Sequence, residues 1–69
     1  MQLSARNIFK GTVKSIMMGA VNAEIIVELA KGLEITSVVT KKSCEDLGLE
    51  IGKETYVIIK ASNVLLGTE

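Results

Sequence analysis

The residues of this chain best suited to chemistry are hydroxyls and cations at three separate places. In an extended segment at the start, side chains alternate between two faces, so Ser4 and Arg6 share one face while Leu3 and Ala5 share the other. Arginine presents a rigid fork of N–H donors that never deprotonates, and serine adds a neutral donor beside it. The pair suits an oxyanion, although a solvated chain terminus would have the same composition.

The second place is the start of a short predicted helix, where Thr40 and Ser43 stand three residues apart. The first turn of a helix has free backbone N–H groups and the positive end of the helix dipole, which together favour an anion. Lys41 and Lys42 in the same turn oppose the dipole. A bound anion would offset that conflict, but an ordinary helix cap would also need Thr40.

The third place is Lys60, which closes an otherwise apolar predicted strand. An ammonium group there is costly unless it has a partner or reaches water. Lysine on an edge strand can also serve only to prevent strands of two molecules from pairing. Each of the three places therefore has an ordinary explanation beside the oxyanion one.

The remaining residues argue against catalysis and against a bound transition metal. Histidine is absent and Cys44 is the only cysteine, so neither a catalytic triad nor the usual metal-ligand sets can be assembled. No glycine motif for nucleotide phosphates occurs. We predict a non-enzymatic protein with no catalytic residues, no organic cofactor and no direct metal ligands. We expect Cys44 to pack as a small hydrophobe.

Charge and hydrophobic content limit the partners. Eight basic and eight acidic residues give a formal net charge of zero, so long-range attraction to nucleic acid or anionic lipid is not built in. Hydrophobic residues make up 48% of the 69 residues, more than the core of so small a domain can hide. No apolar run is long enough for a membrane helix, and residues 1–7 do not form a signal peptide. We predict a cytoplasmic protein that associates with itself.

The elements that must position these side chains are short strands separated by turns. Residues 8–18 are rich in β-formers and contain Gly11, where a bulge or a bend is expected. Residues 19–22 are a candidate turn, residues 23–29 alternate between apolar and polar, and Lys31-Gly32 turns the chain into residues 33–39. Residues 54–60 are apolar on both faces, as in a strand between two layers.

One helix is predicted, with Thr40 as its N-cap, residues 41–47 as two turns and Gly48 in the left-handed position after its end. Five β-segments with a helix between the third and the fourth are typical of an OB-type barrel. The predicted fold is therefore all-β: a small five-stranded OB-type Greek-key barrel with one short helix, in a single domain over residues 1–69.

Taken together, these features resemble the small molybdate-binding proteins called molbindins (Mop type), which are built from the transport-associated OB-type (TOBE) domain. The resemblance covers essentially the whole chain. Its most specific carriers are Ser-Ala-Arg-Asn at residues 4–7 and Lys-Ala-Ser at residues 60–62. Further carriers are residues 9–13, 19–24, 35–40, 43, 47–49 and 52–53.

The resemblance implies a homohexamer, a trimer of dimers, that holds molybdate or tungstate between subunits for storage, buffering or delivery. By position, it assigns one side of an oxyanion pocket to residues near the two chain ends: Ser4, Ala5, Arg6, Lys60 and Ala61. It assigns the facing side to Thr40 and Ser43, and a second oxyanion site near the three-fold axis to Ala20, Val21 and Asn22. Members of the family often carry a hydroxyl residue where this chain has Asn22.

Two other functions stay open on the sequence alone. An OB-type nucleic-acid binder needs aromatic stacking platforms and a basic groove, and only Phe9 and Tyr56 are aromatic here. A purely structural self-assembly module would need no ligand at all. Addition of an anion would separate the last case from the first, because only a binding protein would change in stability.

Overall fold

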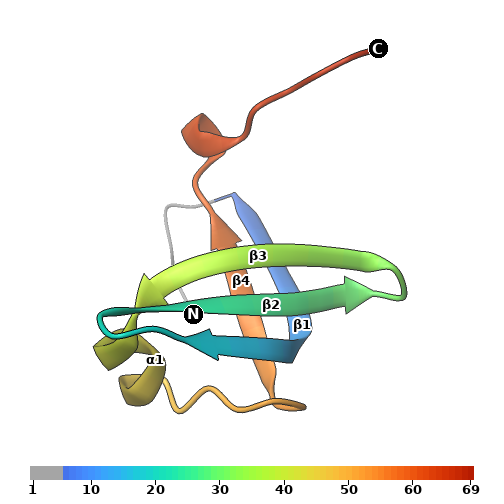
Figure 1. Ribbon diagram of the computed structural model, residues 1–69. Coiled ribbons are helices and arrows are strands. Elements are labelled where there is room, and N and C mark those ends of the chain that lie inside the picture. The colour runs from blue at the N-terminus through green and yellow to red at the C-terminus, as the bar shows by residue number, and fades with distance from the viewer. Residues whose placement is uncertain (1–5) are drawn as a thin grey trace.

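A computed structural model describes residues 6–69, so Ser4 and Ala5 lie outside the described residues. Four antiparallel strands form one curled sheet in the order β3-β2-β1-β4 (Figure 1). The strands are β1 (Asn7–Met18), β2 (Asn22–Ala30), β3 (Leu33–Thr40) and β4 (Glu54–Ile59). The α-helix α1 (Lys41–Asp46) follows β3, and the 3-10 helix η1 (Ala61–Asn63) follows β4.

The long strand β1 pairs with two different strands along its length. Its first half pairs with β4 from Asn7 to Thr12, and its second half pairs with β2 from Thr12 to Met18. Near this crossing Gly11 lies so close to β2 that a Cβ would sit 2.7 Å from the carbonyl oxygen of Glu28. Glycine is therefore needed for the close approach. The bulge that was expected at Gly11 lies instead between Val13 and Ser15, where the register between β1 and β2 shifts.

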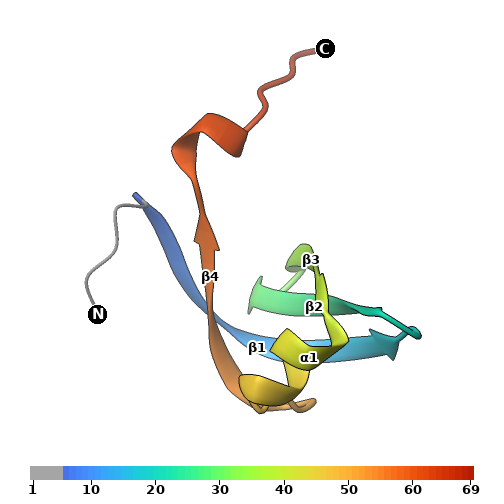
Figure 2. The ribbon, with the colours of Figure 1, turned by 90° about the vertical axis from the view of Figure 1, so that its left-hand side faces the viewer.

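The all-β fold with one short α-helix is confirmed, but residues 6–69 form four strands where five were predicted. The physical reason is the length of β1, which bends and contributes to both halves of the barrel. Among the described residues, β3 and β4 form the two edges of the sheet and do not pair with each other. The barrel is consequently open along one side (Figure 2).

The core lies inside the curl of the sheet, beneath α1. It combines inward-facing strand residues with Cys44, which packs as the small hydrophobe expected of it. Full burial of one large aliphatic side chain contributes about 1.5–3 kcal/mol. The buried residues are Val13, Ala23, Ile25, Val27, Cys44 and Val57.

Strand β4 departs from its prediction as a strand covered on both faces. Val57 points into the core, but the side chains of Tyr56 and Ile58 are 55% and 46% exposed. The described part of the chain therefore covers one face of β4, that of Thr55, Val57 and Ile59, and leaves the other face exposed. Strand β4 also ends at Ile59 and not at Lys60, which instead precedes η1 as its N-cap. The helix η1 was not predicted.

The turn and helix predictions are confirmed with small shifts. Gly32 adopts a φ of +79° in the turn between β2 and β3, a value that favours glycine. Thr40 caps α1, which ends at Asp46 with Leu47 as C-cap, one residue before the predicted end. Gly48 follows with a φ of +65°, the left-handed conformation expected after the helix.

Candidate functional site

Arg6 and Lys60 adjoin the same end of the two-stranded ribbon that the first half of β1 makes with β4. The last pair of this ribbon is Asn7 with Ile59, so Arg6 precedes the pair and Lys60 follows it. We call Arg6, Asn7, Ile59 and Lys60 the ribbon end. Both cationic residues are exposed, and no ion pair joins either of them to a carboxylate within residues 6–69. Two uncompensated cations at one strand end are suited to attracting an anion.

A side-chain hydrogen bond closes the ribbon end. The amide Nδ2 of Asn7 donates to the carbonyl oxygen of Ile59 at 3.2 Å, in a partly buried position. Ala61 is the exposed first residue of η1 and directly follows Lys60. The structure thus brings together three of the five residues assigned to the first side of the pocket, and Ser4 and Ala5 lie outside the described range.

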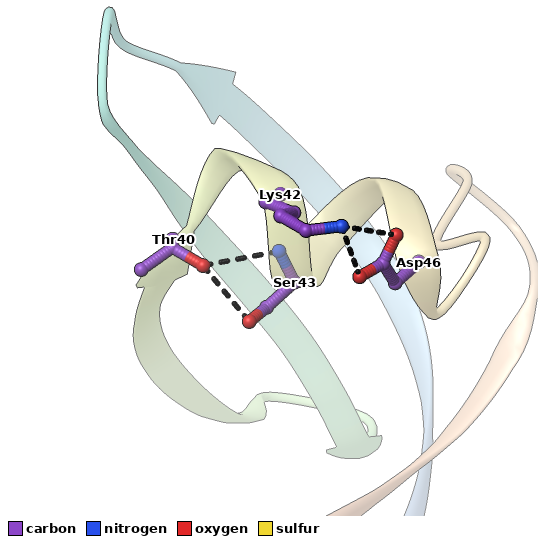
Figure 3. Close-up of polar contacts among 4 residues, drawn as sticks. All are labelled: Thr40, Lys42, Ser43 and Asp46. Carbon is purple, nitrogen blue, oxygen red and sulfur yellow. Dashed lines mark hydrogen bonds and ion pairs between the residues drawn. The ribbon is translucent and has the colours of Figure 1, made fainter.

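Thr40 and Ser43 form a connected pair at the start of α1. The backbone N–H of Ser43 donates to Thr40 Oγ1 at 3.0 Å, and the Thr40 hydroxyl donates to Ser43 Oγ at 2.8 Å (Figure 3). Because a hydroxyl can accept and donate at once, Ser43 keeps its own O–H for a ligand. Thr40 is therefore a helix cap that orients Ser43, and Ser43 is the donor that faces outward.

The cations beside this pair are arranged differently from each other. Lys42 Nζ lies 3.1 Å from Asp46 Oδ2, one turn further along α1 (Figure 3). This ion pair draws the Lys42 charge away from the start of the helix, where it would oppose the dipole. Lys41 contributes its backbone N–H, which donates to the carbonyl oxygen of Val21 at 2.7 Å.

The turn assigned to a second oxyanion site lies against the start of α1. Asn22 pairs with Thr40 across β2 and β3, and the N–H of Gly19 donates to the carbonyl oxygen of Asn22 at 2.8 Å. We call the turn 19–22, Thr40 and α1 the helix end. Sequence reasoning treated Ala20, Val21 and Asn22 as separate from Thr40 and Ser43. The predicted hairpin of residues 23–29 and 33–39 contained the signal, because its pairing continues until residue 22 lies beside residue 40.

The ribbon end and the helix end lie at opposite ends of the barrel (Figures 1 and 2). Arg6 and Lys60 therefore do not meet Thr40 and Ser43 within one chain. The residues that the sequence assigned to one pocket therefore form two separate groups within one chain, a cationic group at the ribbon end and a hydroxyl group at the helix end. Between residues 6 and 69, no cluster of three or more acidic or cysteine side chains could hold a metal ion. No helix of this part of the chain could span a bilayer.

The open antiparallel barrel with one short α-helix is a small OB-type module. The sequence model of the TOBE domain matches residues 3–66, and the chain belongs to this family. It is 45% identical to a Haemophilus influenzae protein named "Probable molybdenum-pterin-binding protein", over 69 residues that cover all of both chains. The predicted family and fold class are confirmed.

Two solved structures share the fold closely. MopII from Clostridium pasteurianum has a TM-score of 0.90 and is 37% identical, covering 97% of this chain and 100% of MopII. ModG is described as a cytoplasmic molybdate-binding protein, and its structure has molybdate bound. It has a TM-score of 0.95 and is 55% identical, and the match covers 100% of this chain but 49% of ModG. This chain therefore corresponds to about half of ModG.

Proposed function

We propose that the protein binds molybdate or tungstate as an intact oxyanion, in sites that a second copy of the chain completes. The observation that supports this most directly is the separation of two complementary half-sites. The ribbon end offers Arg6 and Lys60, and the helix end offers the Ser43 hydroxyl. Relatives named for binding molybdate or molybdenum-pterin support the choice of ligand.

The chemistry of the half-sites suits a tetrahedral oxyanion. Such an anion spreads its charge over four oxygens, so several donors around it stabilise it better than one cation can. The arginine fork and the lysine ammonium supply charge-assisted hydrogen bonds, which are stronger than neutral ones. Hydroxyl and backbone N–H donors supply the remainder. Because sulfate would accept the same hydrogen bonds, discrimination against it must come from the size of the cavity.

Self-association is supported by an apolar groove along the open side of the barrel. The groove lies between the free edges of β3 and β4 and has a volume of about 220 Å³. Its walls include Val39 of β3 and Val57 and Ile58 of β4, with Leu47 and Leu49 near α1. A free strand edge beside an apolar groove can accept a further strand from another molecule.

The segment after η1 is suited to filling such a groove. Leu65 and Leu66 are 92% and 94% exposed, in a stretch that extends away from the barrel (Figures 1 and 2). Exposed leucines of this kind are unusual on a monomer and indicate a contact surface. We propose that the tail of one copy covers the groove of another, and that the assembly is a homohexamer arranged as a trimer of dimers.

The same observations favour storage, buffering or delivery over catalysis, and we propose the cytoplasm as the compartment because ModG is described as a cytoplasmic protein. They give less support to nucleic-acid binding, because the two aromatic residues do not form a shared platform. Phe9 pairs with Val57, which faces the core, whereas Tyr56 lies beside Val57 on the opposite face of β4. Stacking of successive bases needs aromatic rings on one surface.

Calorimetric titration tests the proposed function. We expect molybdate and tungstate to bind much more tightly than sulfate or phosphate. Arg6→Ala should weaken molybdate binding at least tenfold, since a hydrogen bond to a charged group contributes roughly 1.5–3 kcal/mol and about 1.4 kcal/mol is a factor of ten. Arg6→Lys should restore only part of the loss, because the charge returns without the fork.

The matched control is Lys31→Ala, which removes one exposed cation from the turn between β2 and β3. Lys53 is unsuitable, because its Nζ donates to the carbonyl oxygen of Gly48 at 3.0 Å after α1. Equal affinity for all four anions would refute selective binding. Equal affinities of Arg6→Ala and Lys31→Ala for molybdate would remove Arg6 from the site.

A further inference from the structure

We propose that Asn7 is a positioning residue, whose side-chain amide fixes the relative placement of Arg6 and Lys60 for the anion. The inference rests on the proposed function, because it concerns the same half-site. Asn7 directly follows Arg6 in the chain, and Ile59 directly precedes Lys60. The hydrogen bond from Asn7 Nδ2 to the Ile59 carbonyl oxygen, at 3.2 Å, therefore joins the two backbones beside the two cations.

This hydrogen bond matters because it lies at the last pair of the ribbon between β1 and β4. The pairing between β1 and β4 stops at Asn7 and Ile59, and beyond that point the chain turns into η1. The last pair of a two-stranded ribbon has a neighbour on one side only, so it opens more easily than the pairs behind it. In residues 6–69, the other polar side-chain contact between β1 and β4 is the exposed ion pair of Lys10 with Glu54, which lies at the far end of the ribbon. Asn7 closes the pair that would otherwise open first.

Electrostatics adds a reason for a clamp at this place. Arg6 and Lys60 carry like charges at neighbouring strand ends, and like charges on adjacent strands repel. Without an anion, that repulsion favours separation of the two ends. A bond that holds them together before the ligand arrives lowers the ordering cost of binding, which is the effect of preorganisation.

The amide is the side chain that this position requires. Its NH₂ group donates to the Ile59 carbonyl and carries no charge. An aspartate of the same shape would present an oxygen to the carbonyl oxygen, and its negative charge would compete with the anion for Arg6. A leucine of similar size would have no donor. Asn7→Leu and Asn7→Asp therefore remove the bond in two different ways.

The test measures molybdate affinity by calorimetry for these variants of the full chain. Asn7→Leu should bind roughly three- to tenfold more weakly, a loss of about 0.65–1.4 kcal/mol, which is the contribution of an ordinary neutral hydrogen bond. Asn7→Asp should lose more. Asn63→Leu and Asn63→Asp are matched controls in η1, three residues after Lys60, where no side-chain hydrogen bond of Asn63 occurs among residues 6–69. Both should bind within about twofold of the unchanged protein.

A double-mutant cycle separates positioning from a general structural effect. If Asn7 acts through the cations, Asn7→Leu introduced into Lys60→Ala should cost less than about twofold further, because the effects of coupled residues do not add. The melting temperature without ligand and the mass of the assembly should stay close to those of Asn63→Leu. Should Asn7→Leu fail to assemble, the isosteric Asn7→Asp carries the test against Asn63→Asp.

The outcomes distinguish this inference from the proposed function. If Arg6→Ala and Lys60→Ala weaken binding but Asn7→Leu and Asn7→Asp match the Asn63 controls, the positioning role is wrong and the site stands. An equal loss on both backgrounds of the cycle would also overturn the positioning role. If the unchanged protein does not bind molybdate, the proposed function fails and the positioning role fails with it. If the unchanged protein binds molybdate but Lys60→Ala has no effect, only the positioning role fails.

Discussion

At the helix end, four hydrogen bonds between 2.7 and 3.0 Å join the turn, the cap and α1, and three of them have backbone N–H donors. At the ribbon end, one side-chain bond of 3.2 Å joins β1 to β4 at the last strand pair, in addition to the backbone pairing. The helix end also lies over the buried core, whereas Tyr56 and Ile58 of the ribbon are about half exposed. One chain therefore holds the helix end with several hydrogen bonds of its own, whereas the ribbon end has the single Asn7 side-chain bond in addition to its strand pairing.

This difference shows how so small a domain divides its apolar residues. Only six side chains are buried among the residues described, too few to cover both ends of the sheet. Burial is concentrated where β2, the second half of β1 and α1 meet. The exposed apolar side chains of β4 and of the tail are then available for assembly, and the cations beside them would enter the same interface.

Truncation of two isoleucines gives the most direct test of this difference between the buried core and the exposed strand β4. Ile25 is 1% exposed in the core and Ile58 is 46% exposed on β4. Ile25→Ala should lower the free energy of unfolding by about 2–5 kcal/mol through a cavity. Ile58→Ala should cost little in dilute protein and more at high concentration, if assembly covers it. Urea unfolding at two protein concentrations measures both, and equal losses at every concentration would refute the division.

A second test asks whether the exposed leucines of the tail form a contact between copies of the chain. Leu65→Asp combined with Leu66→Asp should reduce the mass measured by light scattering while the circular dichroism spectrum stays that of a folded β protein. Carboxylates in place of leucines would have to be desolvated in the groove, which is costly. Ile51→Asp is the control, because Ile51 is 69% exposed in a loop and does not line the groove. An unchanged mass would show that the tail is not a contact.

The sequence predicted the elements well and their surroundings less well. Turn residues, alternation and the cap are local signals, so the hairpin at Gly32 and the helix after Thr40 were found within about a residue. The apolar residues on both faces of the segment 54–60 also marked Tyr56 and Ile58 as covered, but a hydrophobic pattern cannot say whether the covering residues belong to the same chain. The bond between Asn7 and Ile59 joins residues 52 positions apart, and no local pattern reports such a contact.

The candidate site divides in the same way. Residue types and spacing identified Arg6, Thr40, Ser43 and Lys60 as the polar groups to consider, and the structure puts them into two half-sites. The sequence predicted two possible roles for Thr40, as part of an anion site and as a helix cap, and the structure shows the cap. That its hydroxyl is directed at Ser43 depends on side-chain geometry, which spacing alone could not give.

Thr40 and Ser43 offer a smaller test at the helix end. Thr40→Ala should lower the free energy of unfolding by about 1 kcal/mol, because it removes the cap acceptor of the Ser43 N–H. Ser43→Ala should change stability less, since the cap remains, but it removes the outward-facing donor. Thermal unfolding and molybdate calorimetry of both variants measure the two effects. A Ser43→Ala protein that binds molybdate as before would leave the helix end with a structural role only.

The smallest effect is expected from an ion pair on the outer surface of the barrel. Lys14, at the bulge of β1, hydrogen-bonds to the carboxylate of Glu34 and lies 3.9 Å from Glu28 Oε2. The hydrogen bond and the charge of Glu34 raise the pKa of Lys14 above its ordinary value of 10.5. A raised pKa in the folded state means that the pair stabilises the fold fully below about pH 10.5 and that this contribution is lost as the pH rises through the folded pKa.

Exposed pairs contribute little, so Glu34→Gln should reduce stability slightly at pH 7 and converge with the unchanged protein in strong alkali. Glu54→Gln removes the same charge from the ribbon, where Glu54 lies 3.4 Å from Lys10. Urea unfolding of both variants between pH 7 and about 11.5, at low and high salt, makes the comparison. A gap between Glu34→Gln and the unchanged protein that persists in alkali would show that Glu34 stabilises β3 by packing and not through Lys14.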